Sequence, residues 1–448
     1  MMRNVIEKLK NIKGFRKTGK KLKKAGKFFV DIQKRSPTFF FHSPDIAIAN
    51  ARQPFIPDDI INEKIKALEN NLVEGLSIYK DVISYPVTTG REREFAGGLV
   101  DNKTHKLLEE GIHLGDKGQL TQELPGPDDV LIPGADPPEI RQMVLFGGIV
   151  FNHFGHFLLE SLGRLWAYDY VKDLDPYILF YSDSEIPKYL ENENFIHQVL
   201  SGFNIPLKRV LFINYTVKIN QVIIPVQKYG YRLRNNPDDI FLKFMAGFRF
   251  PRAVPDVFKN AGRIYVSRSR MAIGRVIGEN HFEDYLRDEG FAVLHPELYS
   301  IYQQLAIYNI AGKIIFCDGA AIHTCVLLPA LKADIAVISR RRDPRWSSRN
   351  IIDQFDGYHK KVLWIDCLKD QYQFGRESWH ALSVVDWFEV SVQLKNDGFV
   401  NNLNTLYHEL DLSSLVRSEL RKYIANILDS KEYSDFMIRL KEPLPAKE

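Results

Sequence analysis

The most regular pattern of hydrophobic and polar positions lies in residues 262–368. Short apolar runs predict buried strands at 263–267, 291–295, 313–317, 335–339 and 362–366. Helices are expected between them at 279–289, from a capping box formed by Ser300 and Gln303, and from about Gly319. Strands that alternate with helices of about ten residues predict a parallel, doubly wound α/β sheet.

A second α/β pattern, less regular than the first, covers residues 141–250. Strands are expected at 143–151, 177–181, 210–213 and 222–226, and helices at 156–170, 187–201 and 237–248. Pro251 and Pro255 mark a boundary at about 250–261. Residues 36–140 are rich in turns, with a helix expected at about 58–72 and strands near 79–88 and 96–101.

We therefore divide the chain into four parts. They are a basic amphipathic arm (1–35), an N-terminal α/β domain (36–250), a C-terminal Rossmann-like domain (251–370) and a helical tail that packs back on the domains (371–448). The tail looks mostly helical from about residue 370.

The charge of the chain is unevenly distributed, because the N-terminal arm is strongly basic. Residues 1–35 contain thirteen Lys or Arg and two acidic residues, Glu7 and Asp31, so the net charge of the arm is +11. Because the net charge of the whole chain is +4, the remaining body has a net charge of −7. Val5, Leu9 and Phe15 are interleaved with the basic residues, which favours binding to an anionic membrane surface. A solvated tail or an RNA-binding arm is the alternative, but the acidic body argues against a nucleic-acid partner.

Composition sets further limits. The three cysteines form no CxxC pair, which argues against a disulfide framework and favours a reducing compartment. No apolar run approaches the ~20 residues of a membrane span, and the N-terminus lacks the apolar core of a signal peptide. We therefore expect a cytoplasmic protein. The chain contains no HExxH, and its one DxD run, Asp173–Leu174–Asp175, is expected in an ordinary loop, so no metal site is predicted. No GxGxxG or Walker motif supports hydride transfer or NTP hydrolysis.

One stretch, FNHFGHFLLESLGRLW at 151–166, gathers candidate reactive groups. His156 and Glu160 are four residues apart and so project from the same face of a helix. Asn152 and His153 lie with His156 in a glycine-containing turn between strand and helix, where α/β enzymes often place reactive groups. An arrangement of capping and surface residues would give the same local pattern, and both interpretations stay open.

Polar residues also follow the predicted strands of the second half. Arg268 and Arg275 come after strand 263–267 and could bind a diphosphate, although a solvated basic loop has the same pattern. In the run CDGAAIHT, small residues after Asp318 would let a ligand approach the backbone. The remaining candidates in this half are Gly319, Ala320, Ala321, His323, His295 and Glu297.

Taken together, these motifs resemble family 61 glycosyltransferases. The order is NHFGHFLLESLGRLW, then YVSRSR with a later arginine and an EN pair, then the helix with Gln303–Gln304, then DGAAIH. The resemblance is closest to the bacterial capsular-polysaccharide members and covers about 140–345. It implies an inverting, metal-independent transferase of GT-B type, in which two Rossmann-like domains face each other across a cleft. It implies no cofactor, only a nucleotide-sugar donor as co-substrate.

The resemblance also implies roles for single residues. His156 or its neighbour Glu160 would be the general base, and Asn152 and His153 would lie on the acceptor side in 36–250. Arg268 and Arg275 would neutralise the diphosphate leaving group in the donor-binding domain, 251–370. The pair Glu279–Asn280 matches a family pair in reversed order, and Asp318 stands where relatives commonly have His or Glu, so the donor stays open.

We therefore expect a glycosyltransferase of capsular or other cell-surface polysaccharide biosynthesis. Its acceptor would be an oligosaccharide or a lipid-linked glycan at the cytoplasmic face of the plasma membrane, where the basic arm would hold it as a peripheral protein. A non-catalytic glycan- or membrane-binding protein with a GT-B-like shape is the alternative.

Overall fold

The computed structural model describes residues 74–89, 95–114, 122–123, 137–182, 194–230, 236–342, 351–373, 380–405 and 412–428, with residues 63, 66, 233 and 407. The chain divides into two compact units, 1–44 and 45–448, and every described residue belongs to the second. The predictions for the basic arm, and those for the helix at 58–72 apart from residues 63 and 66, lie outside the described residues.

The N-terminal half forms a mixed seven-stranded sheet in the order β3-β2-β1-β7-β4-β5-β6. Strands β7, β4, β5 and β6 are parallel, whereas β1 is antiparallel to both of its neighbours. Its strands are β1 (Leu76–Thr89), β2 (Phe95–Asp101), β3 (Gln122–Glu123), β4 (Glu139–Ile149), β5 (Tyr177–Tyr181), β6 (Val210–Ile213) and β7 (Val217–Pro225). Ser84 Oγ donates to Tyr181 Oη at 2.9 Å, so β1 curls back toward β5.

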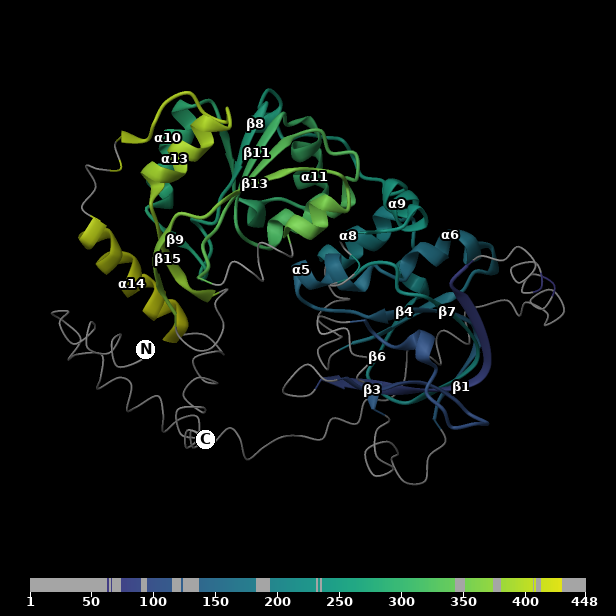
Figure 1. The fold of residues 1–448 in the computed structure, drawn as a ribbon. Helices are drawn as coiled ribbons and strands as arrows, with labels where there is room; N and C mark the ends of the chain where they lie inside the picture. Colours follow the sequence, from purple (N-terminus) through teal and green to yellow (C-terminus); the bar gives the residue numbers. More distant parts are fainter. Residues whose placement is uncertain are drawn as a thin grey trace, which may run out of the picture. The chain divides into compact units, whose positions relative to one another are not determined.

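Helical segments cover one face of this sheet (Figure 1). Phe157, Leu158 and Leu162 pack there with Leu145 and Phe180 in one hydrophobic core. The helical segments that follow β4 in this half are α5 (Phe154–His156), a π-helical turn (Phe157–Ser161), η3 (Leu165–Ala167), α6 (Tyr168–Val171), η4 (Lys172–Leu174), α8 (Phe195–Gly202), η5 (Leu207–Arg209) and α9 (Asp239–Ala246). The short 3-10 helix η1 (Glu109–Gly111) lies beside Leu99 and Leu108 of a second core.

The prediction of a single helix at 156–170 was wrong, because this stretch is divided among α5, the π-helical turn, η3 and α6. All five residues of the π-helical turn are buried, so packing from every side overrides the periodicity of an isolated helix. Gly163 lies against the backbone of Tyr229, where a Cβ atom would come within 2.2 Å of the carbonyl oxygen.

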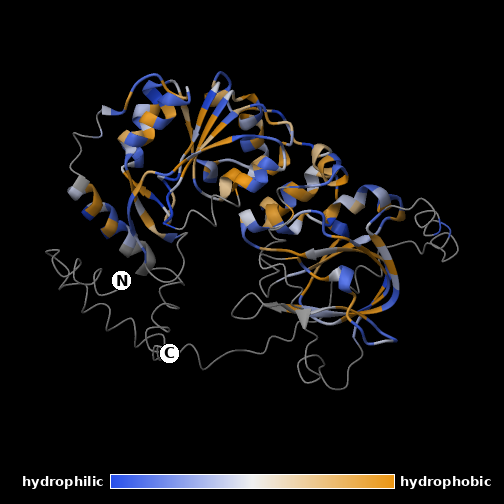
Figure 2. Ribbon diagram, viewed as in Figure 1, coloured by the Kyte–Doolittle hydropathy of each residue, from blue (hydrophilic) through white to orange (hydrophobic). Residues whose placement is uncertain are grey.

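The C-terminal half contains a five-stranded parallel sheet in the order β10-β8-β11-β12-β13. Its strands are β8 (Arg263–Val266), β10 (Ala292–Leu294), β11 (Lys313–Cys317), β12 (Asp334–Ile338) and β13 (Val362–Ile365). The α/β class is confirmed, and all five strands lie within one or two residues of the predicted ranges. In Figure 2 the ribbon of these strands is largely orange, the colour of hydrophobic residues.

Alternate residues of these strands enter two different cores. Tyr265, Ile315 and Ala336 pack with α10 (Glu279–Asp288) and α13 (Trp387–Asn396) on one face. Ile264 and Phe316 pack on the other face with α11 (Ile301–Ile310) and the 3-10 helix η8 (Ala320–Leu327). The same core extends into the N-terminal half, where Gln198 of α8 accepts at its Oε1 from the backbone N–H of Ile301 at 2.9 Å.

A small third sheet, in the order β14-β15-β9, joins the tail to this half. It consists of β9 (Val276–Ile277), β14 (Leu368–Tyr372) and β15 (Leu382–Val385), and α14 (Leu412–Leu428) packs on it through Leu420 and Tyr423. The segment expected as a helical tail therefore also supplies a strand, because β15 buries Leu382 and Val384 against α14. The 3-10 helices η6 (Asp256–Phe258) and η7 (Pro296–Leu298) lie in loops. In the part of the chain that is described, no helix is both long and apolar enough to cross a bilayer.

Candidate active site

His156, Glu160 and His113 form one hydrogen-bonded group. His156 Nδ1 lies 2.5 Å from Glu160 Oε1, and His113 Nε2 lies 3.3 Å from Glu160 Oε2. An ionised carboxylate can only accept, so each of these ring nitrogens carries a hydrogen. In neutral His156, the lone pair then resides on Nε2. The Glu160 side chain is 5% exposed and that of His156 is 25% exposed, so the imidazole is the group that a substrate can reach.

The buried carboxylate stays ionised because of its two partners. Burial by itself raises the pKa of Glu160, but the hydrogen bonds and charges of His113 and His156 outweigh this effect and lower the pKa below its usual value. A buried, ionised carboxylate bonded to Nδ1 fixes the ring orientation and stabilises the imidazolium that forms when Nε2 takes a proton. The arrangement is therefore suited to general-base catalysis by His156.

Arg164 places His113 beside Glu160. Its guanidinium is buried and donates to the carbonyl oxygens of Glu110 and Ile112, both at 2.7 Å, and to that of Pro225. Gln227 holds the same loop from the other side, because its side chain exchanges two hydrogen bonds with the backbone of Leu114. The loop 109–114 is thus fixed to the helical layer although it is about fifty residues away in sequence.

The turn that carries His156 packs directly on η8 of the C-terminal half. A Cβ atom at Gly155 would lie 3.0 Å from His323 Cδ2 and 3.5 Å from Ala320 Cβ, so this glycine permits a close approach. His323 is held in turn by Gln354, with 2.8 Å between Nδ1 and Oε1. His153 lies within electrostatic range of His156 and Glu160, and also of His380 and Arg341 from the other half. Residues from both halves therefore surround His156.

Three arginines gather at the carboxyl ends of β8, β11 and β12. Arg268 Nε donates to Gly274 O at 2.9 Å, and its Nη1 lies so close over Gly319 that a Cβ atom there would be 2.2 Å away. Arg340 is buried and donates to Asp318 O at 2.7 Å. Arg341 pairs with both carboxylate oxygens of Asp318 at 2.9 Å.

This arginine cluster (Arg268, Arg340 and Arg341) has more positive charge than Asp318 can balance. Burial, together with the charges of Arg268 and Arg341, lowers the pKa of Arg340 to about 9, so its guanidinium stays charged at neutral pH. Arg340 Nη1 is buried and has no hydrogen-bond partner among the described residues. An anion that reached the cluster would satisfy this group.

The strand order explains why the cluster forms here. In the order β10-β8-β11-β12-β13, the direction of winding reverses between β8 and β11. Arg268 follows β8, and Asp318 and Gly319 follow β11. Parallel sheets bind ligands at such a switch point, outside the carboxyl ends of the strands.

The other candidates of this half lie in different surroundings. Glu279 is buried and accepts at Oε1 from Tyr265 Oη at 2.8 Å and from the backbone N–H of Arg268 at 2.8 Å, so it supports the loop that carries Arg268. Arg275 pairs with Glu419 of α14 at 2.8 Å. Asn280 and Glu297 are exposed, Ala321 is half-buried, and His295 follows the edge strand β10. Their predicted roles in donor binding stay predictions.

Sequence reasoning missed His113, and it did not include Arg340 and Arg341 among the candidates. His113 lies in the turn-rich segment before residue 140, and no local pattern connects it with Glu160. Arg340 and Arg341 had a signal, since they follow a predicted strand as Arg268 does. Asn152 and His153 are exposed beside His156, whose ring centroid is 4.8 Å from that of His153.

Within the described residues, no group of three or more His, Cys, Asp or Glu side chains could hold a metal ion. No curated protein matches the chain. Residues 154–333 match the model of the family described as Glycosyltransferase 61, a range that includes His156, Glu160, Arg268 and Gly319. The resemblance to family 61 glycosyltransferases seen in the sequence is thereby confirmed over this range.

Proposed function

We propose that this protein is an inverting, metal-independent glycosyltransferase that moves a sugar from a nucleotide-activated donor to a glycan hydroxyl. The observation that carries the proposal is the His156–Glu160 pair, which lies inside the matched range and against the C-terminal half. A single well-placed base is what a one-step displacement with inversion requires.

In this mechanism, His156 Nε2 takes the proton from the acceptor hydroxyl as its oxygen attacks the anomeric carbon. The new C–O bond forms on the side opposite to the breaking bond, so the configuration inverts. Glu160 keeps the ring in place through Nδ1 and stabilises the imidazolium. His113 holds the second carboxylate oxygen, which keeps Glu160 from rotating away.

The leaving group is the nucleoside diphosphate, which departs with the electron pair of the broken bond. The arginine cluster would bind its phosphate oxygens and stabilise the charge that develops on them. Arg340 supports this role because its Nη1, which has no hydrogen-bond partner among the described residues, is buried beside the switch point of the sheet. Three guanidinium groups would supply the charge neutralisation that a divalent cation supplies in other transferases.

The finer features belong to the same proposal. The GT-B arrangement is supported by the two α/β halves that both contribute residues around His156. A place in capsular or other surface polysaccharide biosynthesis, a lipid-linked or oligosaccharide acceptor, and the cytoplasmic membrane face rest on the sequence resemblance and on the basic arm.

The test is a transfer assay with a panel of nucleotide sugars, with and without EDTA, after a thermal-shift screen against nucleoside diphosphates and CMP has narrowed the panel. We expect one donor to be used, EDTA to have no effect, and the product to carry the anomeric configuration opposite to that of the donor. Transfer that EDTA abolishes, or a product with retained configuration, would contradict the proposal. No transfer and no thermal shift with any nucleotide would favour the non-catalytic alternative.

A further inference from the structure

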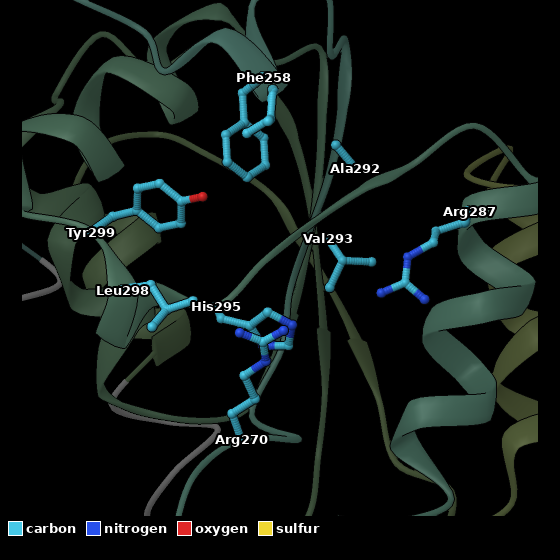
Figure 3. A pocket seen from close by; sticks show the side chains of 9 residues that line it. Phe258, Arg270, Arg287, Ala292, Val293, His295, Leu298 and Tyr299 are labelled. Carbon is cyan, nitrogen blue, oxygen red and sulfur yellow. The ribbon is translucent and has the colours of Figure 1, made fainter.

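A pocket with a volume of about 340 Å³ opens beside β10, the edge strand of the five-stranded sheet (Figure 3). Its lining comes from η6, from the loop after β8, from α10, from β10 and from the segment around η7. None of the lining residues belongs to the His156 group or to the arginine cluster. The volume lies at the small end of the range that ligand pockets occupy.

Among the described residues that line the pocket, Arg270 is the cation available to a ligand. Arg270 is exposed, and no described residue forms an ion pair with its guanidinium. Arg287, on the opposite wall in Figure 3, is paired with Glu283 at 3.0 Å and with Asp284 at 2.5 Å. An anionic group would therefore bind at Arg270, where a planar guanidinium can hold a carboxylate or a phosphate with two hydrogen bonds.

His295 adds an unsatisfied polar group. The residue is 7% exposed, and its Nδ1 is buried without a hydrogen-bond partner among the described residues. Burial lowers the pKa of His295, which favours the neutral ring, with one donor and one acceptor nitrogen. The Nε2 atom lies 3.9 Å from Glu283 Oε2, which leaves Nδ1 for a ligand. A hydroxyl group can satisfy either form of this nitrogen, because it both donates and accepts.

Two aromatic rings form a corner of the pocket. Phe258 and Tyr299 meet edge to face, with 5.5 Å between ring centroids and 78° between the planes. In Figure 3 the Tyr299 hydroxyl points into the space beside Phe258. Aromatic rings offer flat apolar surfaces on which the C–H face of a pyranose can pack, while hydroxyl groups bond to the polar groups around them. An inorganic anion alone would use only Arg270.

We propose that this pocket binds an acidic sugar unit, whose carboxylate or phosphate pairs with Arg270 while its ring packs on Tyr299, which the buried Phe258 supports from behind, and a hydroxyl bonds to His295. The site would hold part of a glycan away from the transfer site, and so select acceptors or products that carry anionic sugars. The inference rests on the lining residues and goes beyond the transfer chemistry proposed above, because it does not depend on which group is the base.

The test is saturation-transfer NMR on the full chain, titrated with D-glucuronate, D-glucose 1-phosphate and neutral D-glucose. We expect at least one anionic sugar to bind saturably and D-glucose to bind at least about tenfold more weakly, as the loss of a charged hydrogen bond predicts. The tighter of the two anionic probes distinguishes a carboxylate from a phosphate ligand. Arg270→Gln should weaken binding at least about tenfold, whereas Arg252→Gln, at an exposed arginine outside the pocket, should not.

His156→Ala separates this inference from the proposed function, since it should abolish transfer and leave the binding of the anionic sugar unchanged. The inference is overturned if neither anionic sugar binds, if Arg270→Gln binds as the wild type does, or if His156→Ala removes binding. Octanoate is the last control. If it displaces the sugar with equal affinity, the pocket recognises an apolar anion and not a saccharide.

Discussion

Replacing Glu160 by Gln removes one charge from the centre of the proposed catalytic group and changes almost no volume. The amide has one acceptor and one donor group, whereas the carboxylate accepts from His156 on one oxygen and from His113 on the other. One histidine must then face an NH2 group, and the imidazolium of His156 loses its counter-charge. We expect kcat to fall by about 10²- to 10⁴-fold, which corresponds to about 3 to 5 kcal/mol of transition-state stabilisation.

The assay is the pH dependence of kcat and kcat/KM with the donor identified by the thermal-shift screen. Loss of the carboxylate disfavours the protonated imidazole, so the acid limb of the profile should move to lower pH while KM for the donor stays near its wild-type value. Glu289→Gln is the matched control, because Glu289 is a buried carboxylate that accepts from the backbone N–H groups of Asn401 and Asn402 in another part of the fold. It should lower stability and leave kcat unchanged.

Two results would refute this reasoning. If folded Glu160→Gln turns over as fast as the wild type, the carboxylate has no part in catalysis. If His156→Ala keeps near-full activity while Glu160→Gln abolishes it, the carboxylate itself is the base and the histidine only supports it. Either result would leave the match of residues 154–333 to the family model intact and change the roles within the site.

Three further predictions follow from the same contacts. The hydrogen bonds of His113 and His156 hold the pKa of Glu160 below its usual 4.5. The stability that they contribute is therefore present above pH 4.5 and is lost as the pH falls through the lower pKa of the folded state. In urea titrations, the unfolding free energy of Glu160→Gln should fall less steeply in acid than that of the wild type. Gly319→Ala should displace the Arg268 guanidinium and weaken nucleoside diphosphate binding by about tenfold in calorimetry, with little change in Tm because only the end of a flexible side chain must move. Ser300→Ala removes one hydrogen bond of the capping box of α11, the one from the Gln303 backbone N–H to Ser300 Oγ, and keeps the one from the Ser300 backbone N–H to Gln303 Oε1. It should cost about 1 kcal/mol of unfolding free energy, measured as a lower urea midpoint.

Each of these predictions has its own control. If the unfolding free energy of Glu160→Gln falls more steeply in acid than that of the wild type, the first prediction is contradicted. Gly262→Ala, where a Cβ atom would meet nothing within 4 Å, should leave diphosphate affinity unchanged, and equal losses at both glycines would contradict the second. Ser201→Ala, at an exposed serine inside α8, should not lower the midpoint as Ser300→Ala does.

The amino-acid sequence by itself determined the features that depend on neighbours along the chain. The five strands of the parallel sheet and the capping box at Ser300 were predicted close to where the structure has them, because strand runs and caps are local patterns. The contact of His156 with Glu160 belongs to the same class, since residues four apart meet on a helical turn even when that turn is a π-helix.

Only the tertiary structure decided the contacts between distant segments. His113 reaches Glu160 because Arg164 and Gln227 hold its loop, and the break in the helix after His156 follows from burial on every side. Arg340 and Arg341 join Arg268 because β12 pairs with β11 next to the switch point, a register that no single strand encodes. Chain connectivity fixes what is near in sequence, whereas sheet order and packing choose which of the distant polar side chains share one site.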